Sequence, residues 1–323
     1  MRKIQKIKIG LTMGDPAGIG PAIIIKAIRK LKNLADFVVI GDKWVFSQLP
    51  ITDYQLPNAK FIDLNNVPRK NFKFGEVRAE YGRASIEYLN KAIELIKDKE
   101  VDCLVTCPVS KEAVNLAGFK DFSGHTEYLA SATNTKYFAM MLLNKRLKIS
   151  LITRHIPLKD VPLQLEKDKI YKTILLTYKS LKELFSVKSP RIIVCGLNPH
   201  ASDNGLIGKE ENKIIKPVLI GLRKKIRDMR LDGPQPADVA ILRASQKQYD
   251  CVIAMYHDQA LIPLKISGAF TGINLTLGLR FVRTSPLHGT AFDIAAKSDL
   301  ANPLSLIEAI KLAVRCTINQ KKG

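Results

Sequence analysis

The chain has 323 residues, of which 46% are hydrophobic, and 51 Lys and Arg against 30 Asp and Glu give a net charge of +21. This length suits two domains with full cores. No apolar run approaches the roughly 18 residues of a membrane span, and the first residues lack the features of a signal peptide, so we expect a cytoplasmic protein without membrane contact. The charge raises the alternative of nucleic-acid binding. The lysines are scattered and no basic helix carries interleaved aromatics, so no specific nucleic-acid partner is expected.

The five cysteines are odd in number and mostly lie in apolar runs of strand type. This pattern indicates buried thiols of a reducing compartment and not a disulfide framework. Cys103 and Cys107 are four residues apart, but no second pair follows them, which argues against a zinc knuckle.

The N-terminal part alternates strand and helix patterns. Residues 6–12 alternate in polarity, which predicts an edge or half-buried strand. The glycine-rich turn TMGDPAGIGP at 12–21 leads into a helix pattern. Such a turn either offers backbone N–H groups to an anion or only needs glycine for its tight geometry, and both interpretations stay open. Further strands are expected at 37–42 and 101–110, with a helix at 79–99 between them, which is typical of a mostly parallel sheet covered by helices.

The middle of the chain adds other patterns. His125 and Thr126 stand at a predicted helix start, with Ser123 or Thr126 available as its cap. Residues 138–144 and 147–153 predict a hairpin, which adds antiparallel strands. The remaining elements expected are a helix near 167–186, a strand at 191–197, a helix from about 209 to 226, a loop at 233–238, and an amphipathic C-terminal helix from Asn302–Pro303 onward.

The stretch from Tyr256 to Asp293 is unusually rich in groups that bind ligands. It follows the apolar run CVIAMY, so His257 and Asp258 stand where a buried strand ends, which is where open α/β sheets place ligands. Six glycines or prolines interrupt the stretch and predict that much of it is loop. Lys265, Asn274 and Arg283 offer cationic or amide groups to an anionic substrate.

Three histidines, His155, His200 and His257, each follow an apolar strand-like run closely. If those strands share a sheet edge, the three imidazoles converge on one point. Three neutral imidazoles suit zinc or a similar divalent ion and leave positions open for a substrate. The alternative is three loop residues with separate roles.

The segment LHGTAFDIAAKSDLANPLSL at 287–306 resembles the adenosine-binding loop of the isocitrate and isopropylmalate dehydrogenases, which bind NAD(P) without the GxGxxG fingerprint. The resemblance implies a set of cofactor-binding residues: His288, Gly289, Thr290, Ala291, Asp293 and Asn302.

Nearly the whole chain resembles the 4-hydroxythreonine-4-phosphate dehydrogenase family. The matching stretches are TMGDPAGIGP, SGHTEYLA, RHIPL, LNPHASDNGLIGKEE, GPQPAD, YHDQALIPLK, NLTLGLRFVRTS and HGTAFDIA. The resemblance implies two α/β/α domains with a mixed, mostly parallel sheet and an active-site cleft between them, as in isocitrate and isopropylmalate dehydrogenases. The expected borders are 1–125 with 285–323 for the terminal domain and 126–284 for the middle domain.

The same resemblance implies roles for individual residues. The metal ligands would be His155, His200 and His257. Substrate contacts would be His125, Thr126, Lys265, Asn274 and Arg283. Asp238, Asp258 and Lys265 are the candidates for catalysis, and the two aspartates are open alternatives for orienting a histidine or relaying a proton. The implied cofactors are NAD or NADP and one divalent metal, zinc first, with magnesium, cobalt or manganese as alternatives.

The family is implied to act as a homodimer that shares the metal site between subunits. It oxidises the secondary alcohol of 4-phosphooxy-L-threonine to 2-amino-3-oxo-4-phosphooxybutanoate, which decarboxylates to 3-amino-2-oxopropyl phosphate in pyridoxal phosphate biosynthesis. One departure is the pair Pro286 and Leu287, where a more polar pair is expected, and this bears on substrate choice. The alternative in the same class is a dehydrogenase of a sugar acid such as 4-phospho-threonate or 4-phospho-erythronate. A phosphotransacetylase shares the architecture but needs neither three histidines nor nicotinamide.

Overall fold

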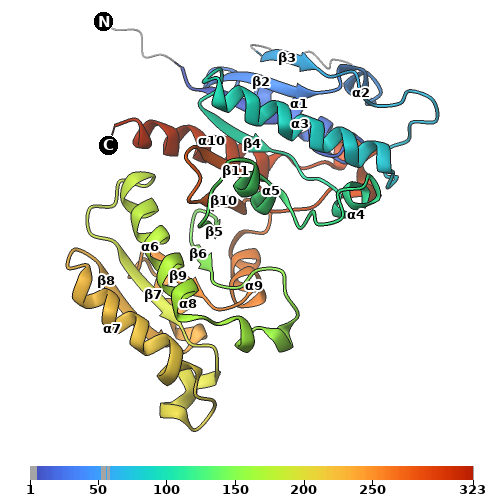
Figure 1. Cartoon of the computed structure of the whole chain (residues 1–323). Helices are drawn as coiled ribbons and strands as arrows, with labels where there is room; N and C mark the ends of the chain where they lie inside the picture. The colour runs from blue at the N-terminus through green and yellow to red at the C-terminus, as the bar shows by residue number, and fades with distance from the viewer. Residues whose placement is uncertain (1–5, 52–55, 57–58, 323) are drawn as a thin grey trace, which may run out of the picture. The chain divides into compact units, whose positions relative to one another are not determined.

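The computed structural model describes residues 6–51, 56 and 59–322, and it divides the chain into two compact units (Figure 1). Unit 1 consists of Met1–Lys136 and Leu279–Ile318, and unit 2 of Tyr137–Gly278 and Asn319–Gly323. Each unit has a β-sheet covered by helices, so the expected mostly parallel α/β fold class is confirmed. No helix among the described residues is long and apolar enough to cross a membrane.

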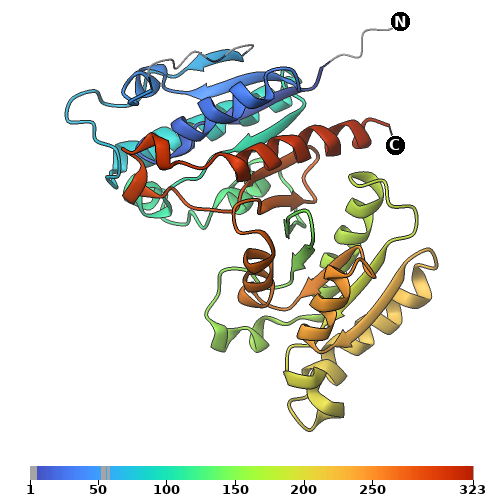
Figure 2. The same ribbon diagram turned by 180° about the vertical axis from the view of Figure 1, so that it is seen from behind.

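The described residues of unit 1 form five strands in the order β3-β2-β1-β4-β11, and the pairings among them are parallel. Figure 1 shows α3 in front of these strands, and Figure 2 shows α1 and α10 on the opposite face. The strands are β1 (Lys8–Thr12), β2 (Asp36–Gly41), β3 (Ala59–Asp63), β4 (Cys103–Thr106) and β11 (Val282–Pro286). The helices are α1 (Gly20–Leu31), α2 (Lys43–Ser47), α3 (Ala79–Lys97), α4 (Lys111–Leu116), α5 (His125–Ala132) and α10 (Leu304–Gln320), with short 3-10 turns at Phe292–Ile294 and Ser298–Leu300.

In unit 2 the described residues form six strands in the order β10-β5-β6-β9-β7-β8. The hairpin of β5 and β6 and the pairing of β10 with β5 are antiparallel, whereas β6, β9, β7 and β8 run parallel. The strands are β5 (Ala139–Leu143), β6 (Lys148–Leu151), β7 (Arg191–Cys195), β8 (Arg230–Gln235), β9 (Cys251–Ala254) and β10 (Ile273–Leu277). The helices are α6 (Lys167–Glu183), α7 (Lys216–Lys225), α8 (Ala237–Ser245) and α9 (His257–Gly268), with 3-10 turns at Leu158–Asp160, Pro162–Gln164 and Pro199–Gly205 and a π turn at Glu211–Ile215.

Four expectations from the sequence are wrong. The loop expected at 233–238 is occupied by the end of β8 and the start of α8, with Pro236 between them. The strand at 6–12 is not at an edge: β1 lies between β2 and β4, and only its first residues reach solvent. Neither Ser123 nor Thr126 caps α5, because Gly124 is the N-cap residue and no side-chain cap bond forms. The stretch 256–293 is mostly regular, since α9, β10 and β11 fill it and Pro263 is accommodated inside α9.

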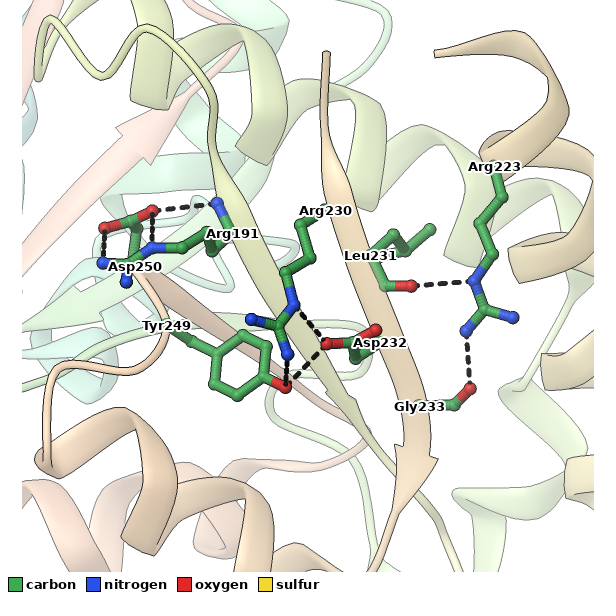
Figure 3. Close-up of polar contacts among 8 residues, drawn as sticks. All are labelled: Arg191, Arg223, Arg230, Leu231, Asp232, Gly233, Tyr249 and Asp250. Carbon is green, nitrogen blue, oxygen red and sulfur yellow. Dashed lines mark hydrogen bonds and ion pairs between the residues drawn. The ribbon is translucent and has the colours of Figure 1, made fainter. Parts of the chain in front are cut away.

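The amino-terminal ends of β7, β8 and β9 are joined by a polar network on the surface of unit 2 (Figure 3). Asp250 accepts hydrogen bonds from the backbone N–H of Arg191 at 2.8 Å and from its guanidinium at 2.9 and 3.1 Å. Asp232 on β8 accepts from Arg230 at 2.7 Å and from the Tyr249 hydroxyl at 2.6 Å. These bonds fix the strands at the end of the sheet opposite to the histidines.

Candidate active site

The three histidines of the expected metal site follow three neighbouring parallel strands. His155 comes after β6, His257 begins α9 directly after β9, and His200 follows β7. Because β6 and β7 both pair in parallel with β9, their carboxyl ends lie at one edge of the sheet of unit 2. The topology therefore brings the three loops to one edge, a relation that no spacing in the sequence gives.

Two of the three imidazoles lie together. The ring centroids of His155 and His257 are 5.4 Å apart, with 47° between the ring planes. Nδ1 of His257 lies 2.6 Å from Oδ1 of Asp258, so the carboxylate accepts the Nδ1 proton and leaves the lone pair on Nε2. This pairing of carboxylate and histidine is the arrangement that orients metal-bound imidazoles in proteins.

His200 is placed differently. It begins a run of five consecutive non-glycine residues with positive φ, from His200 at 53° to Asn204 at 58°. Left-handed backbone costs L-residues about 1–2 kcal/mol each, so this loop is the least favourable backbone near the histidines. Across the described ranges, no group of three or more His, Cys, Asp or Glu side chains is arranged to hold a metal ion. The described part of one chain thus places the rings of His155 and His257 beside each other.

The expected substrate residues divide between the units. His125, Thr126 and Arg283 lie in unit 1, whereas Lys265 on α9 and Asn274 on β10 lie in unit 2. Lys265 is exposed, and Oδ1 of Asn274 is buried without a hydrogen-bond partner among the described residues. A buried carbonyl oxygen of this kind calls for a donor, such as a hydroxyl or ammonium group of a ligand.

Arg283 is the anchor of the unit 1 group. It lies on β11 and only 1% of its surface is exposed. Its guanidinium donates to Oγ1 of Thr106 at 2.6 Å and to Oγ1 of Thr126 at 3.5 Å. Burial lowers the pKa of Arg283 to about 9, and the nearby charge of Glu127 only partly opposes this. A buried cation of this kind is ready to be stabilised by an anion.

His125 is held neutral beside this cation. Burial lowers the pKa of its imidazole well below the usual range, and the positive charges of Arg283 and Lys111 lower it further. Its Nε2 is buried, and the described part of the chain provides no hydrogen-bond partner for it. Lys111 at the start of α4 was not singled out from the sequence, because a lone lysine in a basic chain carries no signal.

The candidate cofactor segment 288–302 follows β11 in unit 1. Nδ1 of His288 lies 3.0 Å from the carbonyl oxygen of Gly289, and burial lowers the pKa of this histidine. Thr290 accepts a backbone hydrogen bond from Ile19 at 3.0 Å, Ala291 has a positive φ of 47°, and Asp293 is exposed. Oδ1 of Asn302 accepts from the N–H of Leu304, so this side chain caps α10.

The glycine-rich turn after β1 serves packing. All residues from 9 to 25 are buried. A Cβ on Gly20 would lie 2.1 Å from the carbonyl oxygen of Met13, and one on Gly14, whose φ is +74°, would lie 2.3 Å from that of Pro108. Close backbone contact therefore requires glycine at these two positions, and the expectation of an anion at this turn stays a prediction.

The remaining catalytic candidates lie at the same edge of unit 2. Asp238 is exposed in the first turn of α8, and its charge helps to raise the pKa of buried Cys195 at the end of β7. Oδ1 of Asp258 lies 2.6 Å from Nδ1 of His257.

A family model described as "Pyridoxal phosphate biosynthetic protein PdxA" matches residues 22–313. The chain belongs to the PdxA family. A 4-hydroxythreonine-4-phosphate dehydrogenase of Sulfurihydrogenibium sp. (strain YO3AOP1) is 42% identical to it, with 95% of this chain and 98% of the relative covered. A D-threonate 4-phosphate dehydrogenase of Cupriavidus necator is 40% identical, with 94% and 95% covered. The crystal structure of a 4-hydroxythreonine-4-phosphate dehydrogenase from Klebsiella pneumoniae is similar to this chain, with a TM-score of 0.83 and 36% sequence identity. The similarity covers 97% of this chain and 100% of that chain.

These relatives are all named as dehydrogenases of small phosphorylated hydroxy acids, so the PdxA family carries oxidoreductase chemistry. A phosphotransacetylase, EutD from Staphylococcus aureus, shares the fold at 14% identity and a TM-score of 0.52, which shows a likeness of architecture alone.

Proposed function

We propose that the chain is a metal-dependent NAD(P) dehydrogenase that oxidises 4-phosphooxy-L-threonine to 2-amino-3-oxo-4-phosphooxybutanoate, which decarboxylates to 3-amino-2-oxopropyl phosphate. The observation that carries this proposal is the 42% identity, over almost the full length of both chains, to a relative named for that activity. Every residue implied as a ligand is present in the chain: His125, Thr126, His155, His200, His257, Lys265, Asn274 and Arg283.

The residues near the strand ends of unit 2 fit a divalent metal. The adjacent rings of His155 and His257 and the carboxylate on Nδ1 of His257 are the features of such a donor set. When bound, a zinc, magnesium, cobalt or manganese ion would act as a Lewis acid on the substrate's secondary alcohol and on the ketone formed from it. Asp258 would hold His257 in the ligating tautomer. Asp238 or Lys265 would take the alcohol's proton or return one after decarboxylation.

Arg283 and His125 would bind the anionic end of the substrate. The guanidinium is already oriented by Thr106 and Thr126, so binding costs little side-chain entropy. Neutral His125 would donate or accept through its buried Nε2. Lys265 would add a second cation, and Asn274 would bind the amino or hydroxyl group beside the reacting carbon.

The cofactor would lie on the segment that carries His288, Gly289, Thr290, Ala291, Asp293 and Asn302, with NAD and NADP as open alternatives. All five cysteines are buried and reduced, which supports a cytoplasmic enzyme.

We further propose a homodimer formed through unit 2. Ile262, Ile266 and Phe270 stand four residues apart along and just after α9 and are 58%, 82% and 66% exposed. An apolar stripe of this kind on a soluble protein is typical of a protein interface. Leu206, which closely follows His200, is 83% exposed. Among the described residues of one chain, no three ligating side chains form a group that could hold a metal, and the third imidazole would be His200 of the partner subunit.

The test is a coupled assay of NAD(P)H formation with purified protein and Zn²⁺. We expect 4-phosphooxy-L-threonine to be oxidised, and its dephosphorylated form to be worse by roughly 10²- to 10⁴-fold in kcat/KM, since two charge-assisted contacts contribute about 1.5–3 kcal/mol each. Equal kcat/KM for the two compounds would show that the cations do not bind phosphate and that the substrate class is wrong.

D-Threonate 4-phosphate is the second candidate substrate, because relatives of 39–40% identity are named for it. The two compounds differ in whether C2 bears an amine or a hydroxyl group. Faster turnover of the sugar acid in the same assay would assign the chain to that activity, and the metal and anion sites would stay as proposed.

A further inference from the structure

Lys111 is an exposed lysine of unit 1 that follows the carboxyl end of β4 and begins α4. The last residue of β4 is Thr106, whose Oγ1 accepts the 2.6 Å bond from the guanidinium of Arg283. Ser110 caps α4, because its hydroxyl accepts from the N–H of Ala113 at 3.1 Å. The chain therefore leads within five residues from a contact of the buried Arg283 to Lys111.

The backbone of Lys111 is also tied to the segment that precedes α5. Nδ2 of Asn115 donates to the carbonyl oxygen of Lys111 at 2.8 Å and to that of Phe122 at 3.3 Å. Phe122 packs in a buried cluster with Val114 of α4 and Ile86 of α3. These contacts fix the start of α4 relative to the start of α5, where His125 and Thr126 lie.

The side chain of Lys111 extends toward the start of α5. A Cβ on Gly124 would lie 3.7 Å from Cε of Lys111 and 3.4 Å from Oε2 of Glu127. Gly124 directly precedes His125, whose Nε2 is buried without a hydrogen-bond partner among the described residues. Burial lowers the pKa of His125, and the positive charges of Arg283 and Lys111 lower it further, which agrees with an ammonium group close to the imidazole.

Lys111 decides the net charge of this site. The negative charge of Glu127 acts on Arg283 and offsets its positive charge, and His125 is neutral. These three side chains together therefore carry no net charge. Lys111 adds one positive charge at the exposed side of the group, where an anion arrives from solvent.

We infer that Lys111 is a further binding residue for the phosphate group of the substrate, at a site in unit 1 that it forms with Arg283 and His125. The inference rests on the proposed function for the identity of the substrate, whereas the anion site itself lies within unit 1. A phosphate group has three terminal oxygens, so a guanidinium, an ammonium and an imidazole N–H can each donate to a different one. A carboxylate has only two oxygens and a single charge.

The experiment measures the binding of inorganic phosphate to the full-length protein by isothermal titration calorimetry, without metal or cofactor. We expect Lys111→Met to weaken phosphate binding about tenfold, near the low end for one charge-assisted hydrogen bond because Lys111 is exposed. Lys111→Arg keeps the positive charge and should bind phosphate within about threefold of wild type. Acetate should bind to the wild type more weakly than phosphate does.

Lys97→Met is the matched control. Lys97 is an exposed lysine in the last turn of α3, so it precedes β4, whereas Lys111 follows the carboxyl end of that strand. The variant loses the same charge and should bind phosphate like the wild type. In the coupled assay, Lys111→Met should raise the KM for 4-phosphooxy-L-threonine about tenfold and leave kcat/KM for the dephosphorylated form unchanged.

Wild-type phosphate affinity in Lys111→Met, an equal loss in Lys97→Met, or acetate bound as tightly as phosphate would overturn the inference. So would a wild-type protein that binds no phosphate. If phosphate binds as expected and weakens in Lys111→Met, but neither candidate substrate is oxidised, the proposed function fails and the anion site with Lys111 stands.

Discussion

Asp15, between β1 and α1, is a carboxyl group that the fold places in the core of unit 1, with 0% of its surface exposed. Burial raises the pKa of Asp15 from 3.8 to about 7, although the backbone N–H groups of Ala17 and Ser110 oppose the shift. The folded protein therefore holds a proton that the unfolded chain loses near pH 4. As the pH rises from about 4 to about 7 the folded state loses stability, and the full cost applies above about 7.

We predict that Asp15→Asn raises the free energy of unfolding at pH 8 and leaves it nearly unchanged at pH 4. Asparagine keeps an oxygen for the bond from Ala17, which is 2.9 Å long, and cannot ionise. At about 1.4 kcal/mol per pH unit, the cost removed at pH 8 is on the order of 4 kcal/mol at most. Urea denaturation of wild type and variant at both pH values measures the difference.

Asp42 is the matched control. It is equally buried, but its two oxygens accept from the N–H groups of Trp44 and Val67, at 3.0 and 2.9 Å. An amide at that position turns one acceptor into a donor, so Asp42→Asn should destabilise the protein at both pH values. A variant Asp15→Asn that is less stable than wild type at pH 8 would show that the ionised carboxylate is favourable in the fold.

At the residue scale, the sequence identified the candidate ligand residues but not the residues that form contacts with them in the fold. His257 and Arg283 stand out by residue type and by the motifs around them. Lys111 is an ordinary residue whose importance comes from its neighbour in space, the buried His125. Thr106 is bound to Arg283 across 177 residues of sequence, a separation that no local pattern spans.

At the element scale, Lys26 joins α1 to the candidate cofactor segment. Its ammonium donates to three backbone carbonyl oxygens, those of Ser298, Asp299 and Ala301, at 2.7, 3.2 and 2.8 Å. Burial lowers the pKa of Lys26, and the charge of Asp299 opposes this effect. The three bonds fix the turn directly before Asn302.

We predict that Lys26→Met raises the dissociation constant of NAD(P) by about tenfold, which corresponds to about 1.4 kcal/mol. The substrate KM and the Zn²⁺ affinity should stay as in wild type, because Arg283 and the histidines are unchanged. Fluorescence titration of the reduced cofactor measures the constant. Lys30→Met, on the same helix at an exposed position, is the control and should bind cofactor normally. Equal NAD(P) affinity in Lys26→Met and Lys30→Met would show that Lys26 does not contribute to cofactor binding.

The elements themselves were predicted best where the pattern was long or strongly apolar. The helix expected at 79–99 is α3, and the hairpin expected at 138–153 is β5 and β6. The stretch 256–293 was misread because Pro263 and the glycines suggested loop, whereas the first turns of α9 and the pairing of β10 with β5 hold it in regular structure. Strand β3 was missed, since its residues are only partly buried and carry little periodic signal.

At the scale of the whole molecule, the exposed apolar side chains of unit 2 and the proposed sharing of metal ligands between subunits lead to one prediction. Under the proposed dimer, each metal site takes His155 and His257 from one chain and His200 from the other. Consider a mixed dimer in which each chain carries alanine in place of a different histidine. One metal site is then intact only if the two replaced histidines are ligands that different subunits supply to a site.

We predict that mixing His200→Ala chains with His257→Ala chains, after reversible dissociation, restores Zn²⁺ binding and activity. In such a mixed dimer, the His200→Ala chain supplies intact His155 and His257 to one site. The His257→Ala chain supplies its intact His200 to that same site. Random pairing makes about half of the dimers mixed, each with one intact site, so about a quarter of wild-type activity is expected. Mixing His155→Ala with His257→Ala should restore nothing, because the rings of these residues lie 5.4 Å apart in one chain.

The dimer itself is tested by Ile266→Lys, which places a charge in the stripe of α9. Sedimentation velocity should show a dimer for wild type and a monomer for the variant, and the monomer should have lost activity because its sites lack the third imidazole. Lys311→Ile, at an exposed position on α10, is a control that should stay dimeric. Rescue in the His155→Ala and His257→Ala mixture, or full activity in monomeric Ile266→Lys, would show that the site is not assembled from two chains in this way.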